Sequence, residues 1–250
     1  MIEDRVEHRD GMCIHWNAPI PMDDGVIMRA DVYRPQGEGA WPVVLTYGPY
    51  GKGLADETLK TFRAKGGKEV LFEGINPGEK DYAALVSKLK SANVDVVYFG
   101  GYYTEAGLIL RQMRDQGLKT ILMAGDALAD KEFASIVGPA AEGVLFTFGP
   151  DPRKKASAAA IVEKFKAKNI DPEGYTLYSY AAFQVWAQAA AKAGTTDGKK
   201  VAAAIKGGKW DAVLGPITYD KKGDITVVDY VVYQWDKGGN YAELPAKSGS

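Results

Sequence analysis

Apolar and polar positions in the middle of the chain alternate between the period of buried strands and the period of amphipathic helices. Residues 94–99 form a nearly continuous apolar and β-branched run, which predicts a parallel strand covered on both faces. Thr104 is the predicted N-cap of the helix that follows. The apolar stripe of this helix consists of Leu108, Leu110, Met113 and Leu118. Residues 120–124 predict a second buried strand, which ends at Gly125 and Asp126.

Strand and helix signals continue to alternate over residues 42–168, which predicts one α/β lobe. Further strands are predicted at residues 42–47, 69–72 and 143–148. Further helices are predicted at residues 54–65, 81–92, 131–137 and 157–168. Because elements of these lengths are typical of parallel strands joined by right-handed crossovers, the predicted fold class is α/β, with a mainly parallel sheet flanked by helices.

The residues before and after this lobe show a different pattern of apolar and polar positions. Residues 1–41 are interpreted as a β arm, because Asp23-Asp24-Gly25 is a turn signal inside a predicted hairpin at residues 15–35. Residues 169–246 form a trailing segment of helices and strands, and residues 247–250 are predicted to be a disordered tail. The trailing segment contains predicted helices at 175–194 and 199–205 and predicted strands at 214–219 and 227–235.

Composition and charge exclude several classes of function. The hydrophobic content of 46% suffices for a core, and a net charge of −1 gives no basic face for nucleic acid. No apolar run approaches the roughly 20 residues that span a bilayer, so membrane insertion is not expected. The charged first ten residues exclude a secretory signal in the chain as written, which predicts a cytoplasmic location for it in that form. Cys13 is the single cysteine, so the chain has no internal disulfide.

Two polar candidates follow the ends of neighbouring predicted strands. Tyr102 follows the strand at 94–99, and Asp126 follows the strand at 120–124. Ligands of open α/β sheets bind at the carboxyl ends of the strands, so these two residues are the best site candidates. The alternative interpretation is structural: Asp126 caps the helix near Lys131, and Tyr102 covers the edge of the sheet.

Six stretches occur in the order in which one known family has them: residues 50–56, 78–90, 94–119, 138–153, 175–190 and 214–224. Over residues 50–244 the chain resembles the leucine/isoleucine/valine-binding proteins, the substrate-binding components of branched-chain amino-acid ABC transporters. The resemblance implies a type I periplasmic-binding-protein-like fold, in which two α/β lobes clamp an amino acid around a hinge. It also implies a transporter permease as partner and a periplasmic location.

The resemblance further implies four ligand-binding residues. Asp126 stands at the acidic position that neutralises the α-ammonium of the ligand, and Tyr50, Tyr102 and Tyr175 match aromatic positions that line the cleft. An enclosed zwitterion needs a partner for each charge, and truncating one member of such a pair costs roughly 2–5 kcal/mol. The resemblance implies no cofactor, no metal and no catalytic residue.

The N-terminal part of the chain departs from this family. About a hundred residues that build most of the first lobe in family members have no counterpart, so an incomplete first lobe is expected. Residues 1–54 resemble instead the α/β-hydrolases of the X-prolyl dipeptidyl-peptidase and cocaine-esterase type, in the stretches 19–35 and 41–54. In those enzymes the tyrosine that matches Tyr50 contributes to the oxyanion hole. We interpret the chain as a chimera joined near Tyr50.

The sequence gives no support for hydrolysis, because it contains no G-x-S-x-G elbow and no histidine after His15. His8, Cys13 and His15 are interpreted as surface residues of the arm rather than as metal ligands. The predicted function is therefore a non-catalytic, branched-chain amino-acid-binding module with weak ligand binding. The alternatives are a structural fragment that self-associates through an exposed half-core, and an inactive hydrolase fragment.

Overall fold

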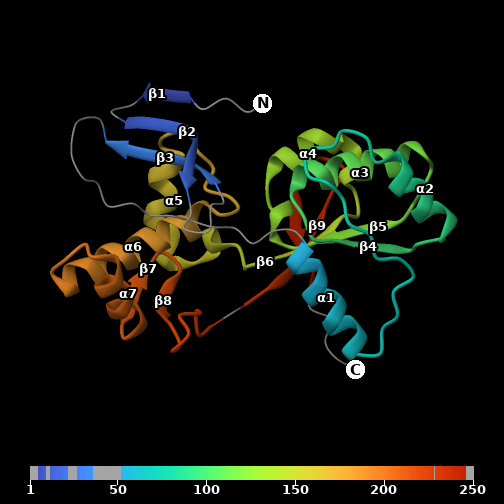
Figure 1. Ribbon diagram of the computed structural model, residues 1–250. Helices are drawn as coiled ribbons and strands as arrows, with labels where there is room; N and C mark the ends of the chain where they lie inside the picture. The colour runs from blue at the N-terminus through green and yellow to red at the C-terminus, as the bar shows by residue number, and fades with distance from the viewer. Residues whose placement is uncertain (1–4, 10–11, 22–26, 36–51, 228, 246–250) are drawn as a thin grey trace. The chain divides into compact units, whose positions relative to one another are not determined.

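The computed structural model divides the chain into two units, Met1–Tyr47 and Gly48–Ser250 (Figure 1). The structure describes residues 5–9, 12–21, 27–35, 52–227 and 229–245. The predicted strand at 42–47 and the site candidate Tyr50 lie outside the described residues.

The first unit contains a three-stranded antiparallel sheet in the order β1-β2-β3. Its strands are β1 (Arg5–Arg9), β2 (Met12–Pro21) and β3 (Ile27–Pro35). The pairing of β2 with β3 confirms the predicted hairpin, whereas β1 was not predicted. The interpretation of Cys13 as a surface residue is wrong, because only 2% of it is exposed. A thiol is nearly apolar, so burial of an unpaired cysteine is common.

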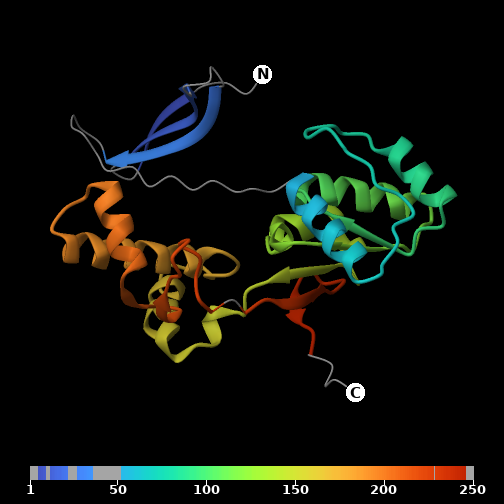
Figure 2. The ribbon, with the colours of Figure 1, turned by 60° about the horizontal axis from the view of Figure 1, so that its bottom comes forward.

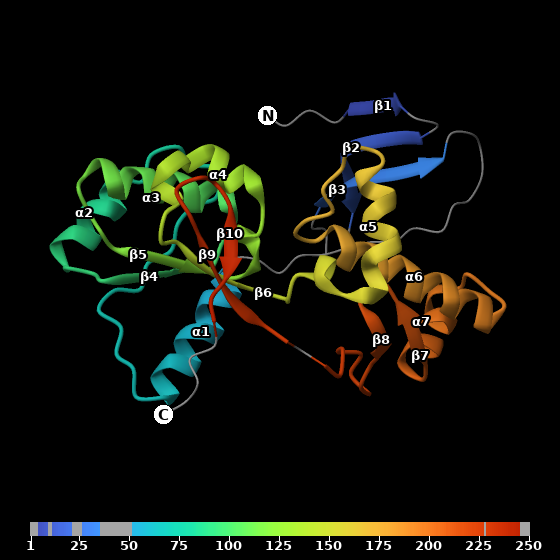
Figure 3. The same cartoon turned by 180° about the vertical axis from the view of Figure 1, so that it is seen from behind.

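A five-stranded mixed sheet organises part of the second unit, in the order β10-β9-β6-β5-β4 (Figure 3). Its strands are β4 (Val96–Phe99), β5 (Ile121–Ala124), β6 (Leu145–Phe148), β9 (Val231–Trp235) and β10 (Tyr241–Glu243). β4, β5 and β6 are parallel, as predicted. β9 and β10 return from the C-terminal part of the chain and pair antiparallel. The structure confirms the α/β class with flanking helices.

Helices cover one face of this sheet. They are α2 (Ala83–Ser91), α3 (Tyr103–Asp115) and α4 (Lys131–Val137), and they lie together above the strands in Figure 1. Leu122 and Ala124 of β5 are fully buried in the core, whereas Ile121 is 41% exposed and Val96 of β4 is 52% exposed. The prediction of strands covered on both faces is therefore wrong for the described residues. Helix α1 (Lys52–Ala64) is mostly exposed and buries little of the opposite face.

A second hydrophobic core lies between helices and a small hairpin (Figure 2, yellow to orange). Its elements are α5 (Ala159–Lys166), α6 (Thr176–Ala193), α7 (Gly198–Lys206), β7 (Lys209–Ala212) and β8 (Gly215–Thr218). One face of α6 is buried at the spacing of successive helical turns, through Leu177, Ala181, Val185 and Ala189. Gly194 ends α6 in the left-handed conformation, with φ 62°, which an L side chain rarely adopts. The strand β7 was not predicted.

Short 3₁₀ turns complete the described elements: η1 (Asp126–Leu128), η2 (Gly138–Ala141), η3 (Pro152–Lys154) and η4 (Ala156–Ala158). Two local predictions are wrong. Residues 69–72 form no strand, and Val70 is 71% exposed, because no described strand pairs with this segment. Thr104 is not an N-cap, because α3 already begins at Tyr103. Within the described part of the chain, every helix is too short or too polar to cross a membrane.

Candidate functional site

The three parallel strands end at the same edge of the sheet. Phe99, the last residue of β4, pairs with Ala124, the last residue of β5. Ala124 in turn pairs with Phe146, two residues before the end of β6 at Phe148. Because the strands are parallel and in register here, the residues that follow them emerge at one edge, where open α/β sheets bind ligands.

Asp126 emerges at this edge as the first residue of η1 and is partly buried. Its carboxylate has no hydrogen bond and no ion pair with any residue that the structure describes. Asp130, rather than Asp126, caps α4: its Oδ1 accepts a hydrogen bond from the backbone N–H of Glu132 at 2.8 Å. The capping alternative for Asp126 is therefore wrong, and its carboxylate is available to a cationic group.

The structure brings two of the three candidate tyrosines to strand ends of this edge. Tyr102 is the last residue of the loop that connects β4 to α3, and it is 47% exposed. Tyr175 directly precedes α6 and is 40% exposed. Its ring stands edge-on to Phe148 at the end of β6, with 4.9 Å between the ring centroids. Phe148 was predicted as part of a strand but not as a support for the site.

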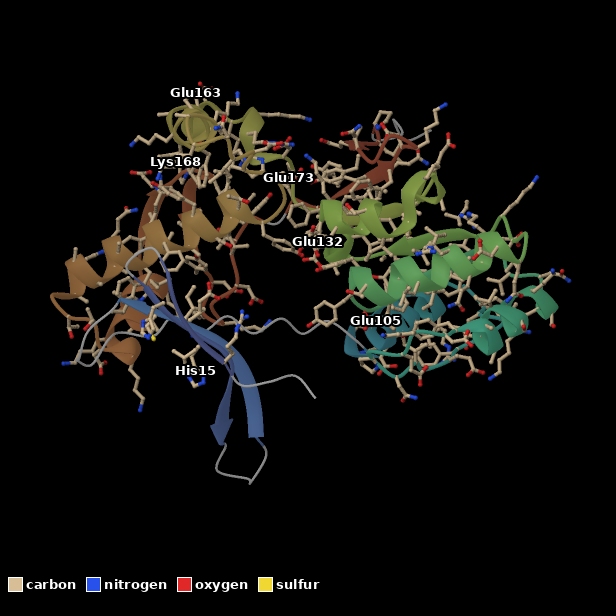
Figure 4. All side chains as sticks on the ribbon, turned by 90° about the horizontal axis from the view of Figure 1, so that it is seen from above. His15, Glu105, Glu132, Glu163, Lys168 and Glu173 are labelled. Carbon is tan, nitrogen blue, oxygen red and sulfur yellow. The ribbon has the colours of Figure 1, made fainter. Side chains whose placement is uncertain are left out.

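Hydrogen bonds hold the start of α3, and with it Tyr102, in place. The hydroxyl of Tyr103 donates a hydrogen bond of 2.7 Å to Glu132 of α4, which raises the pKa of Tyr103 to about 12, with burial adding to the effect. Glu105 accepts a hydrogen bond of 3.1 Å from the backbone N–H of Gly78 (Figure 4 labels Glu105 and Glu132). The second carboxylate oxygen of Glu105 is buried without a hydrogen-bond partner among the described residues.

The segment that leaves β6 is also fixed by hydrogen bonds. The hydroxyl of Tyr178 donates to the carbonyl of Pro150 at 2.8 Å, and that of Tyr233 donates to the carbonyl of Gly149 at 3.1 Å. Burial is the largest cause that raises the pKa of each of these two phenols to about 12; the next cause is the neighbouring Tyr233 for Tyr178, and Glu243 for Tyr233. Both tyrosines therefore stay neutral at physiological pH and act as hydrogen-bond donors.

Charged side chains surround the loop that leads to Tyr175. Arg153 contacts Asp151 at 2.8 Å and Asp171 at 2.9 Å, and Lys131 of α4 contacts Glu173 at 3.0 Å. Glu132 and Glu173 are labelled in Figure 4. Because the pairs Arg153–Asp171 and Lys131–Glu173 join different segments of the chain, these contacts position the start of α6 and its aromatic residue.

Two hollows among the described residues lie away from Asp126, Tyr102 and Tyr175. One is lined by Glu57, Thr58, Thr61 and Phe62, and the other by Lys166, Asn169, Ile170 and Asp171.

Comparison with known proteins identifies a family that matches most of this chain. A family profile described as "Periplasmic binding protein" matches residues 30–240. The chain is 55% identical over 193 residues to "Leu/Ile/Val-binding protein homolog 1" of Brucella suis, which covers 77% of this chain and 52% of the relative. It is 48% identical over 198 residues to "Amino acid binding protein" of Pseudomonas aeruginosa, with 78% and 53% covered. The chain thus spans about half the length of the curated relatives it matches.

Solved structures show the same fold. A leucine-binding protein of Thermotoga maritima has a TM-score of 0.69 at 32% identity, over 79% of this chain and 57% of that one. A branched-chain amino acid transporter substrate-binding protein of Streptococcus pneumoniae, in complex with isoleucine, has a TM-score of 0.65 at 25% identity, over 76% and 56%. These relatives are solute-binding proteins rather than enzymes, in agreement with the predicted non-catalytic module.

Proposed function

The chain belongs to the periplasmic binding protein family, and from this premise we propose that it carries one wall of a binding site for a branched-chain amino acid. The observation that carries the proposal is the Asp126 carboxylate, which is partly buried at the strand edge and has no hydrogen bond or ion pair among the described residues. Relatives named for binding leucine, isoleucine and valine support this ligand class.

In the proposed complex each part of the ligand meets a different group. The α-ammonium group pairs with the Asp126 carboxylate. The resemblance to the leucine/isoleucine/valine-binding proteins implies the same role for this residue. The exposed faces of Tyr102 and Tyr175 contact the aliphatic side chain, because aromatic rings offer large apolar area with little loss of side-chain freedom. Tyr50 is proposed as a further aromatic contact and lies outside the described residues.

We propose that this chain by itself binds the ligand weakly. It spans about half of the length of its curated relatives, so it carries only part of the contacts of a complete site. If a complete site of this kind binds with a free energy near −8 kcal/mol, half of the contacts leave about −4 kcal/mol, which corresponds to a dissociation constant near 1 mM.

The test is a titration of the isotope-labelled chain with leucine, followed by NMR chemical shifts, which detect millimolar binding. We expect Asp126→Asn to weaken leucine binding at least tenfold, because it removes the charge that pairs with the ammonium group. The matched control is Glu142→Gln, which removes an exposed carboxylate and is expected to leave the affinity unchanged. Micromolar affinity in the wild-type chain would contradict weak binding, and equal affinities of the wild type and Asp126→Asn would contradict the site.

The transporter permease and the periplasmic location remain proposals that rest on the family. The relationship of residues 1–54 to hydrolases also remains a proposal; the periplasmic family match begins at residue 30, so the two resemblances overlap. The proposed role of this segment is non-catalytic, because the chain has neither a nucleophile elbow nor a histidine after His15.

Self-association is a second candidate, favoured by apolar side chains that the structure leaves exposed. Phe183 on α6 is 58% exposed, Val227 is 67% exposed and Val96 is 52% exposed. Association of two chains would bury apolar area at these side chains. We expect light scattering after size exclusion to give a mass above the 27.0 kDa of one chain, and Phe183→Glu to lower that mass. A monomer at every concentration would contradict this candidate.

A further inference from the structure

Tyr230 lies at the same sheet edge as Asp126, although the strand that it precedes is distant from Asp126 in sequence. It directly precedes β9, whose first residue, Val231, pairs with Phe148 at the end of β6. Because β9 is antiparallel to β6, the beginning of β9 meets the end of β6. Tyr230 therefore extends past the strand end that supports Tyr175.

The electrostatic environment of Tyr230 agrees with this placement. Burial and then the negative charge of Asp126 raise the pKa of the Tyr230 phenol. Tyr230 also contributes, after burial and Tyr233, to the raised pKa of Tyr178. The ring of Tyr178 lies 5.4 Å from that of Phe148. Tyr230 is thus near both the carboxylate and the aromatic group of the candidate site.

The exposure of Tyr230 is unlike that of a core residue. It is 60% exposed, whereas Tyr233 within β9 is 3% exposed and packs against Phe146. A side chain that is open to solvent, beside a carboxylate that has no hydrogen bond or ion pair among the described residues, is accessible to a ligand. Nothing in the packing of the described core requires a phenol at this position.

We propose that Tyr230 is a specificity-determining residue of the amino-acid site, where its phenol oxygen and ring recognise the α-ammonium group together with Asp126. This inference rests on the proposed function. An ammonium group has three N–H donors, and one carboxylate does not satisfy all three, so a neighbouring phenol oxygen provides a further acceptor. The face of the tyrosine ring also attracts a cation. The residue therefore favours amino acids over carboxylic acids of the same shape that lack the amine.

The test compares leucine with 4-methylpentanoate, which has the same carbon skeleton without the amine. We expect Tyr230→Phe to weaken leucine binding about threefold and Tyr230→Ala about tenfold, in NMR titrations of the full chain. Both variants are expected to bind 4-methylpentanoate as the wild type does. The control is Tyr219→Phe, because Tyr219 is also partly buried and has its pKa raised by burial alone. A merely structural role would change the two affinities together.

A second measurement needs no ligand. We expect Asp126→Asn to lower the pKa of Tyr230, measured from the NMR signals of labelled tyrosine, and Glu142→Gln to leave it unchanged. An unchanged pKa in Asp126→Asn would overturn the inferred proximity and the inference with it.

The outcomes separate this inference from the proposed function. If Asp126→Asn weakens leucine binding and Tyr230→Phe and Tyr230→Ala do not, only the inference on Tyr230 is overturned. If the wild type does not bind leucine, or Asp126→Asn binds it equally well, the proposed function fails and the inference fails with it. A loss of leucine affinity in both sets of variants, with 4-methylpentanoate unaffected, supports both.

Discussion

Trp235→Ala is expected to lower the free energy of unfolding by about 3–5 kcal/mol, the usual range for deleting a buried aromatic side chain. Trp235 is the largest fully buried side chain, with 1% of it exposed. Its ring lies 4.8 Å from that of Tyr241 and 5.6 Å from that of Phe133. The substitution removes these contacts and leaves a cavity between β9 and α4.

The same substitution removes a hydrogen bond that reaches the candidate site. Nε1 of Trp235 donates to the carbonyl of Leu128 at 3.2 Å, and Leu128 ends the 3₁₀ turn that begins at Asp126. Without this donor, a buried carbonyl has lost its partner, which adds to the cost of the cavity. Trp235 therefore stabilises the sheet core and the backbone that carries Asp126.

Urea unfolding followed by circular dichroism measures this loss, since the signal does not depend on the removed tryptophan. Val70→Ala is the control, because Val70 is 71% exposed and its truncation is expected to change the free energy by less than about 0.5 kcal/mol. A loss below 1 kcal/mol for Trp235→Ala would contradict the packing described here.

The spacing of apolar residues within each segment was sufficient to predict most elements of the fold. The helix at 175–194 and the hairpin at 15–35 appear as α6 and as β2 with β3, because their apolar spacing and turn residues act within one element. The segment 69–72 has a comparable apolar pattern and is not a strand. A strand requires a pairing partner, and pairing is not encoded in the period of a single segment.

The candidate site, too, could be predicted only where it depends on single segments rather than on strand pairing. Asp126 and Tyr102 could be placed together from sequence, because each directly follows a strand of one parallel pair. Tyr230 could not, because its position depends on the antiparallel register between β9 and β6, which are separated by the whole second core. Tyr230 falls inside the predicted strand at 227–235, whereas β9 begins only after it, so no signal in the sequence indicated that this residue lies at a strand end. Tyr50, the remaining candidate, stays a prediction.

Arg153→Met is expected to lower the free energy of unfolding by about 1–3 kcal/mol. Arg153 donates hydrogen bonds of 2.8–3.1 Å to Asp151 and of 2.9–3.0 Å to Asp171. The side chains of Arg153 and Asp151 are only 30% and 19% exposed. Breaking a fully buried pair costs about 3–5 kcal/mol, and partial exposure of this pair reduces that cost. Urea unfolding measures the loss.

The matched control is Lys166→Met, which breaks an ion pair with Glu163 whose side chains are 61% and 72% exposed. Because solvent screens such a pair, the control is expected to change the free energy by less than about 0.5 kcal/mol. Equal effects of the two variants would show that Arg153 stabilises the chain no more than a surface lysine does.

The pH dependence of the unfolding free energy provides a second test of this prediction. Burial alone would raise the pKa of Asp151, but hydrogen bonds from the side chain and the backbone N–H of Arg153 outweigh burial and lower it below 3.8. A carboxyl group whose pKa is lower in the folded state stabilises the fold above its unfolded pKa, and this contribution disappears as the pH falls below that value. The difference in unfolding free energy between the wild type and Arg153→Met should therefore be largest near neutral pH and should shrink as the pH falls below about 4. A difference that stays constant down to pH values well below 4 would assign the effect of Arg153 to packing of its aliphatic stem rather than to its charge.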